Sequence, residues 1–600
     1  MSWFSNIISI FTSRFRIDDK KDERNSDMSL SKPLLVAAID FGTTYSSWAF
    51  SLLNEYESDP TQMSAKQWQG HDSTKGPTTV LIQPDGITLE AFGFEAETRY
   101  AELIDEEKHD SYYFFKRFKM KLWDKKIERD MLIEDENSRH LSAKTVFALA
   151  IKWLKDDLWR VSNDRISGTI RENEIHWVLT VPAIWDNTAK QFMREAAKQA
   201  GIKEKKLTVA LEPEAASLFC RHLPVERSGN ETSLGKLKAG QRYLVLDAGG
   251  GTIDITVHEV LQSMDVKELF KASGGAWGGT KVDEAFKGFI NDIAGFDAMG
   301  DLKRKHLDDF IDLFRRFENK KRSISPDKDS KTVIPLPLSL CSLIENRQGR
   351  ALCDIIKNTS YASSVSMTNE KVKIDASVAR WFFDTSVSST VEHLKNILSS
   401  PVNRGVEAIL VVGGFSESPM LQHAVGKEFG ALKRIVPREA SLAVLKGAVI
   451  FGHNPNAITE RISKLTYGVK TTQLFDKAKH DPTKKIFYDG EARCDDIFSK
   501  HVEIGQKLKI GQAQSKERYT VCEINQTSAD FPIFTTYQKD PMYTTNPGCT
   551  RVGKLSVPLS GSGLDRWASV RFIFGGTEID VEATEESTGK VHNLNIDFLV

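Results

Sequence analysis

Residues 34–52 read LLVAAIDFGTTYSSWAFSL, and residues 242–261 read RYLVLDAGGGTIDITVHEVL. In both segments an apolar run leads to an aspartate, Asp40 or Asp247, and a turn rich in glycine and threonine follows before a second apolar run. This alternation predicts a β-hairpin with a tight turn in each segment. Because the same pattern occurs in two distant parts of the chain, it also indicates an internal duplication.

The segments around these hairpins alternate between predicted strands and helices. Apolar positions three and four residues apart indicate core-facing helices, and Gly201 is a helix stop signal. The predicted elements are a helix over 141–160, a strand over 175–181, a helix over 187–200, a strand, glycine turn and helix over 407–430, and an apolar helix over 440–452. Such alternation is typical of an α/β fold.

The pattern changes after residue 456. Short apolar segments separated by Gly, Asp, Asn and Pro predict strands without intervening helices, which favours an antiparallel β-sandwich. The predicted strands lie at 466–473, 501–510, 518–524, 553–558, 568–574 and 578–583.

Composition excludes several classes of function. The chain has 600 residues with 81 basic and 82 acidic side chains, so its net charge of −1 gives no reason to expect a nucleic-acid partner. Its six cysteines form no CxxC pair, which argues against a disulfide framework and favours a reducing, cytoplasmic location. No apolar run is long enough to predict a transmembrane helix.

The first residues, MSWFSNIISIFTSRFR, carry apolar side chains at helical spacing followed by arginines. Two interpretations stay open for this segment: an interfacial helix that makes weak membrane contact, or a frayed tail. The charged, polar residues 17–31 predict disorder, so an ordered fold is expected to begin at Pro33.

The first hairpin turn has the chemistry of a phosphate site. Gly42, Thr43, Thr44 and Tyr45 expose backbone amides and hydroxyls at the tip, which suit the β- and γ-phosphates of a nucleotide. Asp40, at the strand end, suits a Mg²⁺ ion held through water. Alone, the segment fits a plain hairpin with turn-forming residues equally well.

The second turn strengthens the phosphate interpretation. Three consecutive glycines, Gly249, Gly250 and Gly251, precede Thr252 and Asp254, and such a run indicates close approach of the backbone to a ligand. A third glycine turn, Gly413-Gly414-Phe415, opens a helix and would let the backbone approach adenosine. By itself this third turn is a weak signal.

The three turns, in this order, resemble the pattern of the actin, sugar-kinase and heat-shock ATPase superfamily. The finer resemblance is to the seventy-kilodalton heat-shock protein family, through WVLTVPAIWDNTAKQFMREAAKQAG, ALEPEAASLF, GGAWGGTKVDEAF and RRFENKKRSIS. The IWDN variant, the Trp277 insertion and the missing lid resemble the divergent branch of that family called heat shock 70 kDa protein 12 (12A and 12B). The resemblance implies a two-lobed actin-like (ribonuclease H-like) ATPase followed by an antiparallel β-sandwich.

The resemblance also implies roles for individual residues. Lys116 would place the attacking water, and Glu212 and Asp254 would orient that water or the ion. Asp40 and Asp247 would hold Mg²⁺ through waters. Phosphate contacts would come from the two turns, and the nucleoside of ATP or ADP would contact Glu318, Lys321, Arg322, Ser325, Gly413, Gly414 and Phe415.

This sequence departs from the family pattern at several of these positions. Glu417 stands where the family usually has an arginine that stacks on adenine, and Ser441 stands where an aspartate is usual. The phosphate residues are intact, so the sequence predicts nucleotide binding with slow turnover.

The resemblance divides the chain into four parts: a tail over 1–32, an ATPase domain over 33–455, a linker over 456–466, and a sandwich over 467–600 that lacks the family's helical lid. It implies a monomer whose sandwich binds protein or extended-peptide clients, with cochaperones as further partners. Three hypotheses stay open for the function: a chaperone-like ATPase, an ATP-regulated scaffold or adaptor with little turnover, and a small-molecule kinase. The C-terminal binding module disfavours the kinase.

Overall fold

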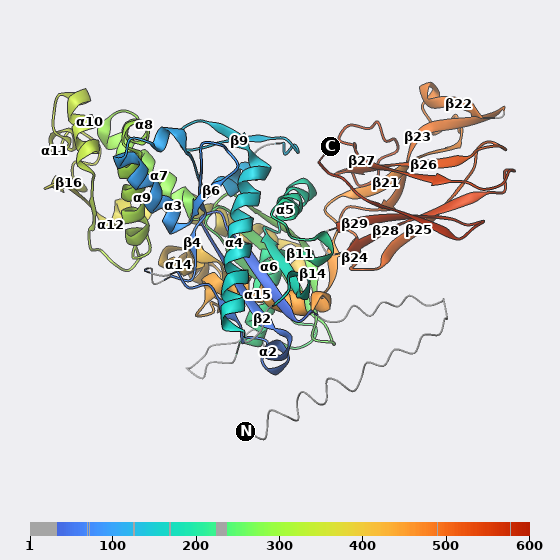
Figure 1. The fold of residues 1–600 in the computed structure, drawn as a ribbon, viewed down its shortest axis with the longest axis horizontal. Coiled ribbons are helices and arrows are strands. Elements are labelled where there is room, and N and C mark those ends of the chain that lie inside the picture. Colours follow the sequence, from blue (N-terminus) through green and yellow to red (C-terminus); the bar gives the residue numbers. More distant parts are fainter. Residues whose placement is uncertain are drawn as a thin grey trace, which may run out of the picture.

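The computed structural model is a mixed α/β structure built around several β-sheets (Figure 1). It describes residues 33–599 apart from 69, 71–72, 124–125, 167–169, 224–236, 489 and 576–577. The predictions for the segment before Pro33, an interfacial helix or a frayed tail, lie outside the described residues. Within the described part, no helix combines the length and apolar character needed to cross a membrane.

The first predicted hairpin lies at the centre of a six-stranded sheet. Strand β1 (Leu35–Phe41) pairs antiparallel with β2 (Tyr45–Leu52) and parallel with β10 (Ile175–Val181), which pairs parallel with β11 (Leu207–Leu211). All of β1 is buried because helices cover both faces of the sheet. Alternate residues of β1 therefore pack against α4 (Ala143–Arg165) on one face and α15 (Ala443–His453) on the other.

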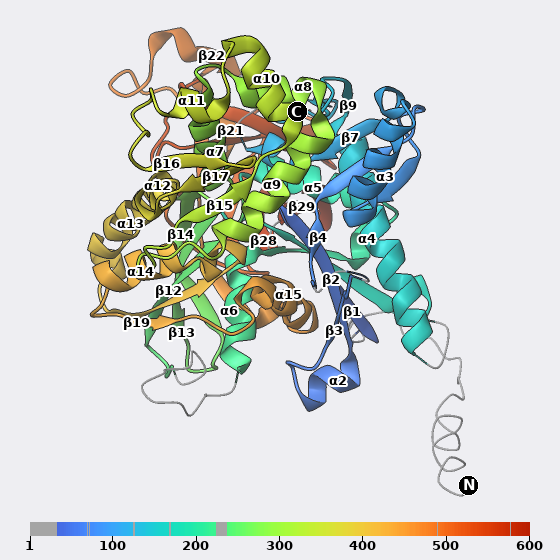
Figure 2. The same ribbon diagram turned by 90° about the vertical axis from the view of Figure 1, so that its left-hand side faces the viewer.

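The second predicted hairpin lies in a seven-stranded sheet of order β19-β18-β12-β13-β14-β20-β24. Its hairpin strands are β12 (Arg242–Ala248) and β13 (Ile253–Val260), which pair antiparallel, and β18 (Val406–Val412) pairs parallel with β12. Helices α6 (Glu212–His222) and α15 pack together between the two sheets, as Figure 2 shows. The hairpin, the parallel neighbour and the shared helices repeat the arrangement of the first sheet.

The predicted helices are confirmed with small boundary shifts. Helix α5 (Asn187–Gln199) begins after Asp186, whose carboxylate accepts a hydrogen bond from Ala189 N as an N-cap, and α4 is capped in the same way by Ser142. The other main-sheet strands are β3 (Ser64–Ala65), β4 (Gly76–Pro77), β14 (Val266–Gly275), β19 (Lys433–Ile435), β20 (Ile458–Ile462) and β24 (Lys507–Lys509).

Smaller sheets and helices surround these two sheets. The small sheets contain β5 (Thr79–Ile82), β6 (Leu89–Phe92), β7 (Tyr113–Lys116), β8 (Leu132–Glu134), β9 (His140–Ser142), β15 (Thr332–Pro335), β16 (Val365–Thr368) and β17 (Lys371–Ile374). The remaining helices are α2 (Leu53–Ser58), α3 (Phe94–Asp105), α7 (Thr280–Ala294), α8 (Ala298–Lys305), α9 (Leu307–Lys321), α10 (Leu338–Gln348), α11 (Leu352–Ile356), α12 (Ala376–Trp381), α13 (Asp384–Ser399) and α14 (Pro419–Glu428).

The last part of the chain forms two antiparallel sheets that share one apolar cluster. The five-stranded sheet contains β22 (Lys485–Tyr488), β23 (Glu491–Val502), β21 (Thr466–Leu474), β26 (Ser528–Thr536) and β27 (Thr550–Pro558). The four-stranded sheet contains β25 (Ala513–Thr520), β28 (Trp567–Gly575), β29 (Glu578–Glu585) and β30 (Lys590–Asn595).

The strand predictions in this region are partly wrong. The strands predicted at 466–473, 553–558, 568–574 and 578–583 are confirmed. The prediction at 501–510 spans the end of β23, a turn and β24, and the prediction at 518–524 overlaps only the end of β25. Most of β23 and all of β26 were missed because β23 carries several charged residues and β26 contains Asp530 and Pro532. Their pairing with β21 on both sides stabilises them despite this composition.

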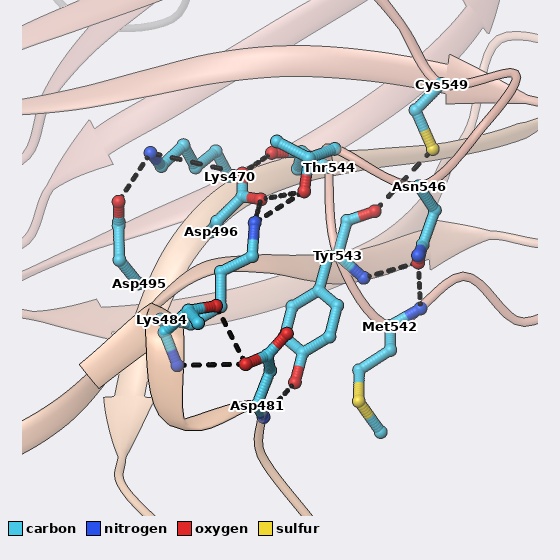
Figure 3. A network of polar contacts seen from close by, with 12 residues as sticks. Lys470, Asp481, Lys484, Asp495, Asp496, Met542, Tyr543, Thr544, Asn546 and Cys549 are labelled. Atoms are coloured by element: carbon cyan, nitrogen blue, oxygen red, sulfur yellow. Dashed lines mark hydrogen bonds and ion pairs between the residues drawn. The ribbon is translucent and has the colours of Figure 1, made fainter.

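A polar network supports the loop that precedes β27 (Figure 3). Asp496, only 4% exposed, accepts hydrogen bonds from the hydroxyls of Thr544 and Thr545 and forms an ion pair with Lys484 at 2.6 Å. Tyr543 Oη accepts a hydrogen bond from Asp481 N at 2.9 Å. The network therefore ties the 538–549 loop to the chain that leads into β22.

Strand pairing, polar contacts and apolar packing join these C-terminal sheets to the rest of the molecule. Strand β20 pairs parallel with β14 and antiparallel with β24, so it continues the seven-stranded sheet into the C-terminal part. Asp597 accepts hydrogen bonds from Gln191 of α5 at 2.7 Å and from Arg129 at 2.9 Å. Leu599 is buried in the apolar cluster of the first sheet.

Candidate nucleotide site

The two hairpin turns predicted to hold phosphate contact one another. A methyl group added to Gly251 would lie 2.7 Å from Thr43 Oγ1, and one added to Gly250 would overlap Thr44 Oγ1. Glycine is therefore required at both positions for this close approach. The tips of the two sheets meet at a single place although Thr43 and Gly250 are far apart in the sequence.

A cavity of about 170 Å³ lies between the turns. The predicted residues that line it are Asp40, Gly42, Thr43, Thr44, Tyr45, Glu212, Asp247, Gly249, Gly250, Gly251, Thr252, Arg322, Gly413 and Gly414. Gly413 has a φ of 87°, and a methyl group there would overlap the Asp247 carboxylate. The third glycine turn is thus part of the same site.

The carboxylates of Asp40, Glu212 and Asp247 line the cavity, and the buried Asp254 is close enough for its charge to act on Asp247. Asp247 and Asp254 are directly opposite one another on β12 and β13, so their side chains point to the same face. Glu212 is the first residue of α6. Three of the carboxylates have protein partners: Asp40 with Thr180 and Lys75, Glu212 with Lys119, and Asp254 with Ile184 N.

Protein cations balance only part of the negative charge of these carboxylates. Burial raises the pKa of Asp247 well above its usual range, and the charges of Glu212, Asp254 and Asp40 raise it further. Burial also raises the pKa of Glu212 to about 7, against the opposing effect of Lys119. No ion pair to Asp247 occurs among the described residues. The carboxylates therefore favour an additional cation.

The residues present fit a Mg²⁺ ion held through water. Hard cations prefer carboxylate oxygens, and Mg²⁺ commonly keeps several of its waters. Among the described residues no three carboxylate, imidazole or thiol groups converge as direct metal ligands. Asp247 is the carboxylate best suited to hold it, because Asp40 already has a protein cation.

Lys116 does not join the carboxylate group. Its ammonium forms an ion pair with Glu97 at 2.7 Å, and it lines a separate cavity beside Arg117 and Met120. The lysine beside Glu212 is Lys119, at 2.7 Å and 1% exposed. The structure therefore places Lys119, and not the predicted Lys116, beside Glu212. Residue 116 ends β7, which turns its side chain toward α3, and the turn that follows brings Lys119 to the site.

A second cavity, of about 200 Å³, adjoins the first through Thr44, Tyr45 and Gly250. It is lined by Glu318 and Lys321 of α9 and by the adjacent Arg322, with Phe415 from the third turn, as predicted for a nucleoside site. Phe415 stacks on Phe383 with ring centroids 6.4 Å apart. Its apolar wall and ring of charged groups suit a flat, polar base.

Ser325 does not line this cavity. It lies in a different surface cavity beside Lys328 and Lys331, because the chain turns away from the site after α9 ends. Asp283, which the sequence gave no reason to select, instead forms ion pairs with Lys321 at 2.7 Å and Arg117 at 2.8 Å.

Sequence reasoning missed Lys75, Lys119 and Asp283. Lys119 is one of several basic residues in KRFKMK, and Lys75 follows a polar stretch with no periodicity. Only the packing of distant segments distinguishes them, so no local signal identified them.

Comparison with known proteins agrees with this geometry. The family model described as Hsp70 protein matches residues 113–486. Mouse heat shock 70 kDa protein 12A is 32% identical over 624 residues, which cover 94% of this chain and 92% of the relative. The chain belongs to the Hsp70 family.

Other Hsp70 relatives place the chain within the family. Human heat shock 70 kDa protein 12B is 32% identical over 631 residues, with 94% of this chain and 91% of the relative covered. Chaperone protein DnaK of Thermoplasma volcanium is 27% identical over 308 residues, which are 49% of this chain and 43% of the relative. The predicted resemblance to the protein 12 branch of the Hsp70 family is thus confirmed.

Proposed function

We propose that the chain is an ATP-binding chaperone-like protein in which residues 33–455 form a two-lobed actin-like (ribonuclease H-like) ATPase. The observation that carries the proposal is the contact between the two glycine- and threonine-rich turns, Thr43-Thr44 and Gly250-Gly251, over one group of carboxylates. Phosphoryl transfer depends mainly on alignment and charge stabilisation, and this site supplies both. Membership of the Hsp70 family supports the same function.

In this proposal different residues of the chain bind the phosphates, bind the nucleoside and orient the attacking water. The backbone amides of the two turns hold the phosphates, and Glu318, Lys321 and Arg322 hold the nucleoside. Lys119 and Glu212, joined by an ion pair, orient the attacking water. A Mg²⁺ ion near Asp247 would supply charge stabilisation for the phosphates.

Residues 467–600 would act as a β-sandwich that binds extended peptide or protein clients, and residues 456–466 as the linker. The pairing of β20 with both β14 and β24 supports this division, because one short strand connects the nucleotide half to the C-terminal sheets. A change in lobe closure could then alter client binding through β20. Client binding, cochaperones, a monomeric state and cytoplasmic location rest on the family resemblance and stay predictions.

Isothermal titration of the full chain with ADP and ATP in Mg²⁺ tests nucleotide binding. We expect both nucleotides to bind and an inorganic phosphate control to bind far more weakly. A titration that shows no heat with either nucleotide would contradict the proposal.

A second candidate is an ATP-regulated scaffold or adaptor with little turnover. Glu417, whose exposed carboxylate lines both cavities, favours this second candidate. A negative charge at the nucleotide site opposes tight nucleotide binding and fast turnover. Single-turnover hydrolysis separates the two candidates. A wild-type rate no higher than that of a Lys119→Met variant would support the adaptor.

A further inference from the structure

Lys75 places a positive charge inside the phosphate cavity. Its Nζ lies 2.6 Å from Asp40 Oδ2, and its side chain is only 19% exposed. It lines the same cavity as Thr43, Thr44 and the glycines of the second turn. A lysine at this place therefore faces both a buried carboxylate and the space proposed for phosphate.

The loop that carries Lys75 is fixed by hydrogen bonds. Ser73 Oγ donates to Lys75 O at 2.7 Å and accepts from Lys75 N at 3.2 Å. Ser47 of β2 donates to Thr74 O at 2.5 Å. Immediately afterwards, Gly76 and Pro77 pair with β2 as strand β4. Because the backbone is held on both sides of Lys75, its side chain is kept within reach of the site.

Both carboxylate oxygens of Asp40 are occupied by the protein itself. Oδ1 accepts a hydrogen bond from Thr180 Oγ1 at 2.9 Å, and Oδ2 contacts Lys75. Asp40 thus has a cation and a hydroxyl from its own chain, one on each carboxylate oxygen.

Two lysine ammonium groups form ion pairs with members of the carboxylate group. Lys119 pairs with Glu212 and Lys75 with Asp40, while Asp247 has no cation among the described residues. Asp247 therefore needs a cation from outside the chain, whereas Lys75 already balances the charge of Asp40. A lysine ammonium is also a compact charge on a flexible stem, so it can turn from a carboxylate to a phosphate oxygen.

We propose that Lys75 is a built-in counter-cation that takes the place of a divalent ion at Asp40 and so weakens the Mg²⁺ requirement for nucleotide binding. The inference rests on the proposed nucleotide function of this site and specifies how the site balances phosphate charge. The ligand class is a nucleoside di- or triphosphate that binds in either a magnesium-loaded or a magnesium-free form.

The test is the affinity of the full chain for ADP, measured by titration calorimetry in Mg²⁺ and again in EDTA. We expect removal of Mg²⁺ to weaken ADP binding to the wild-type chain by less than about tenfold. In Lys75→Met the same removal should weaken binding by a hundredfold or so, because one charge-assisted contact to phosphate is lost with the metal. Lys126→Met, at an exposed lysine, is the matched control and should follow the wild type.

A second measurement needs no nucleotide. Mn²⁺ binding followed by electron paramagnetic resonance should be weaker for the wild-type chain than for Lys75→Met, because the lysine competes with the ion for Asp40. Circular dichroism and thermal unfolding establish that the variant folds.

Each outcome has a separate meaning. Equal loss of ADP affinity in EDTA for the wild type and Lys75→Met would overturn the inference, as would equal Mn²⁺ binding. Absence of ADP binding to the wild type in Mg²⁺ would instead refute the proposed function. Tight, equal binding of ADP in Mg²⁺ by both chains, with divergence only in EDTA, supports the counter-cation role.

Discussion

Arg461 Nη2 lies 2.5 Å from Glu214 Oε2, and both side chains are buried. Arg461 belongs to β20, and Glu214 lies in the first turn of α6, two residues after Glu212. A second contact, from Arg461 Nε to Glu214 Oε1 at 2.8 Å, makes the pair bidentate. The proposed linker is therefore anchored to the helix that begins at the carboxylate group of the nucleotide site.

Breaking this pair on one side should release the linker strand. Arg461→Met leaves the Glu214 carboxylate buried without its partner, and we expect a cost of about 3–5 kcal/mol. The double variant Arg461→Met/Glu214→Met should recover most of that loss, because neither charge of the pair stays buried. Denaturant unfolding and the protease sensitivity of residues 456–466 measure both effects. Equal destabilisation of the single and double variants would show that the ion pair is not responsible.

Glu268 should make this docking depend on pH. Burial and the nearby Glu214 charge raise the pKa of Glu268 to about 7, while its carboxylate accepts hydrogen bonds from Ile462 N and Ala272 N. From about pH 4.5 to about 7 the folded chain keeps a proton that the unfolded chain releases. Stability should therefore fall as pH rises through this interval, by up to about 3 kcal/mol, and level off above it.

The matched variant for this effect is Glu268→Gln, which cannot titrate. Hydrogen exchange of the β20 amides, corrected for intrinsic rates, should show weaker protection at pH 8 than at pH 5.5 in the wild type. In the variant the corrected protection should be the same at both values. A pH dependence that survives in the variant would assign the effect to another group.

Lys119 should matter more for hydrolysis than Lys116. Lys119→Met removes the charge beside Glu212, and we expect the single-turnover rate to fall by about a hundredfold to a thousandfold. Lys116→Met breaks the ion pair with Glu97, which keeps Arg315 as a partner, so its rate should stay within about tenfold of the wild type. Titration with ATP should show that both variants still bind. A slower rate for Lys116→Met than for Lys119→Met would instead support a role for Lys116 in placing the attacking water.

Gly250→Ala should separate the two turns. The added methyl group overlaps Thr44 Oγ1, so the hairpins must move apart and ADP affinity should fall by at least about tenfold. Gly288, in the interior of α7 with open space around it, is the control position. Gly288→Ala should leave ADP binding unchanged and increase stability by up to about 1 kcal/mol. Unaltered ADP affinity in Gly250→Ala would contradict the closeness of the turns.

Leu599→Ala should loosen the C-terminal sheets from α5. Leu599 is 3% exposed in the apolar cluster of the first sheet, so its truncation should cost about 2–5 kcal/mol of local docking energy. Leu564, 53% exposed, is the matched control, and Leu564→Ala should have little effect. Small-angle scattering should show a larger radius of gyration for Leu599→Ala alone. Identical scattering curves for the two variants would show that Leu599 does not hold the C-terminal sheets against the rest of the molecule.

The sequence alone determined the parts of this protein that depend on neighbouring residues. The hairpins around Asp40 and Asp247, helix α5 with its cap at Asp186, and strands β21, β28 and β29 follow from periodicity and turn chemistry, which are local properties. The family resemblance, carried by short motifs, is local in the same sense. These features could be predicted because a strand, cap or turn needs few distant contacts.

The tertiary structure alone decided which side chains share the site. Lys75, Lys119 and Asp283 come from segments with no distinguishing pattern, and Lys116 and Ser325 turn away from the places that the motif match gave them. A side chain's partner depends on the direction in which its element leaves a turn and on packing across the chain. Charge balance at Asp40 is therefore a property of the folded molecule, since Lys75 reaches it from a separate loop 35 positions along the chain.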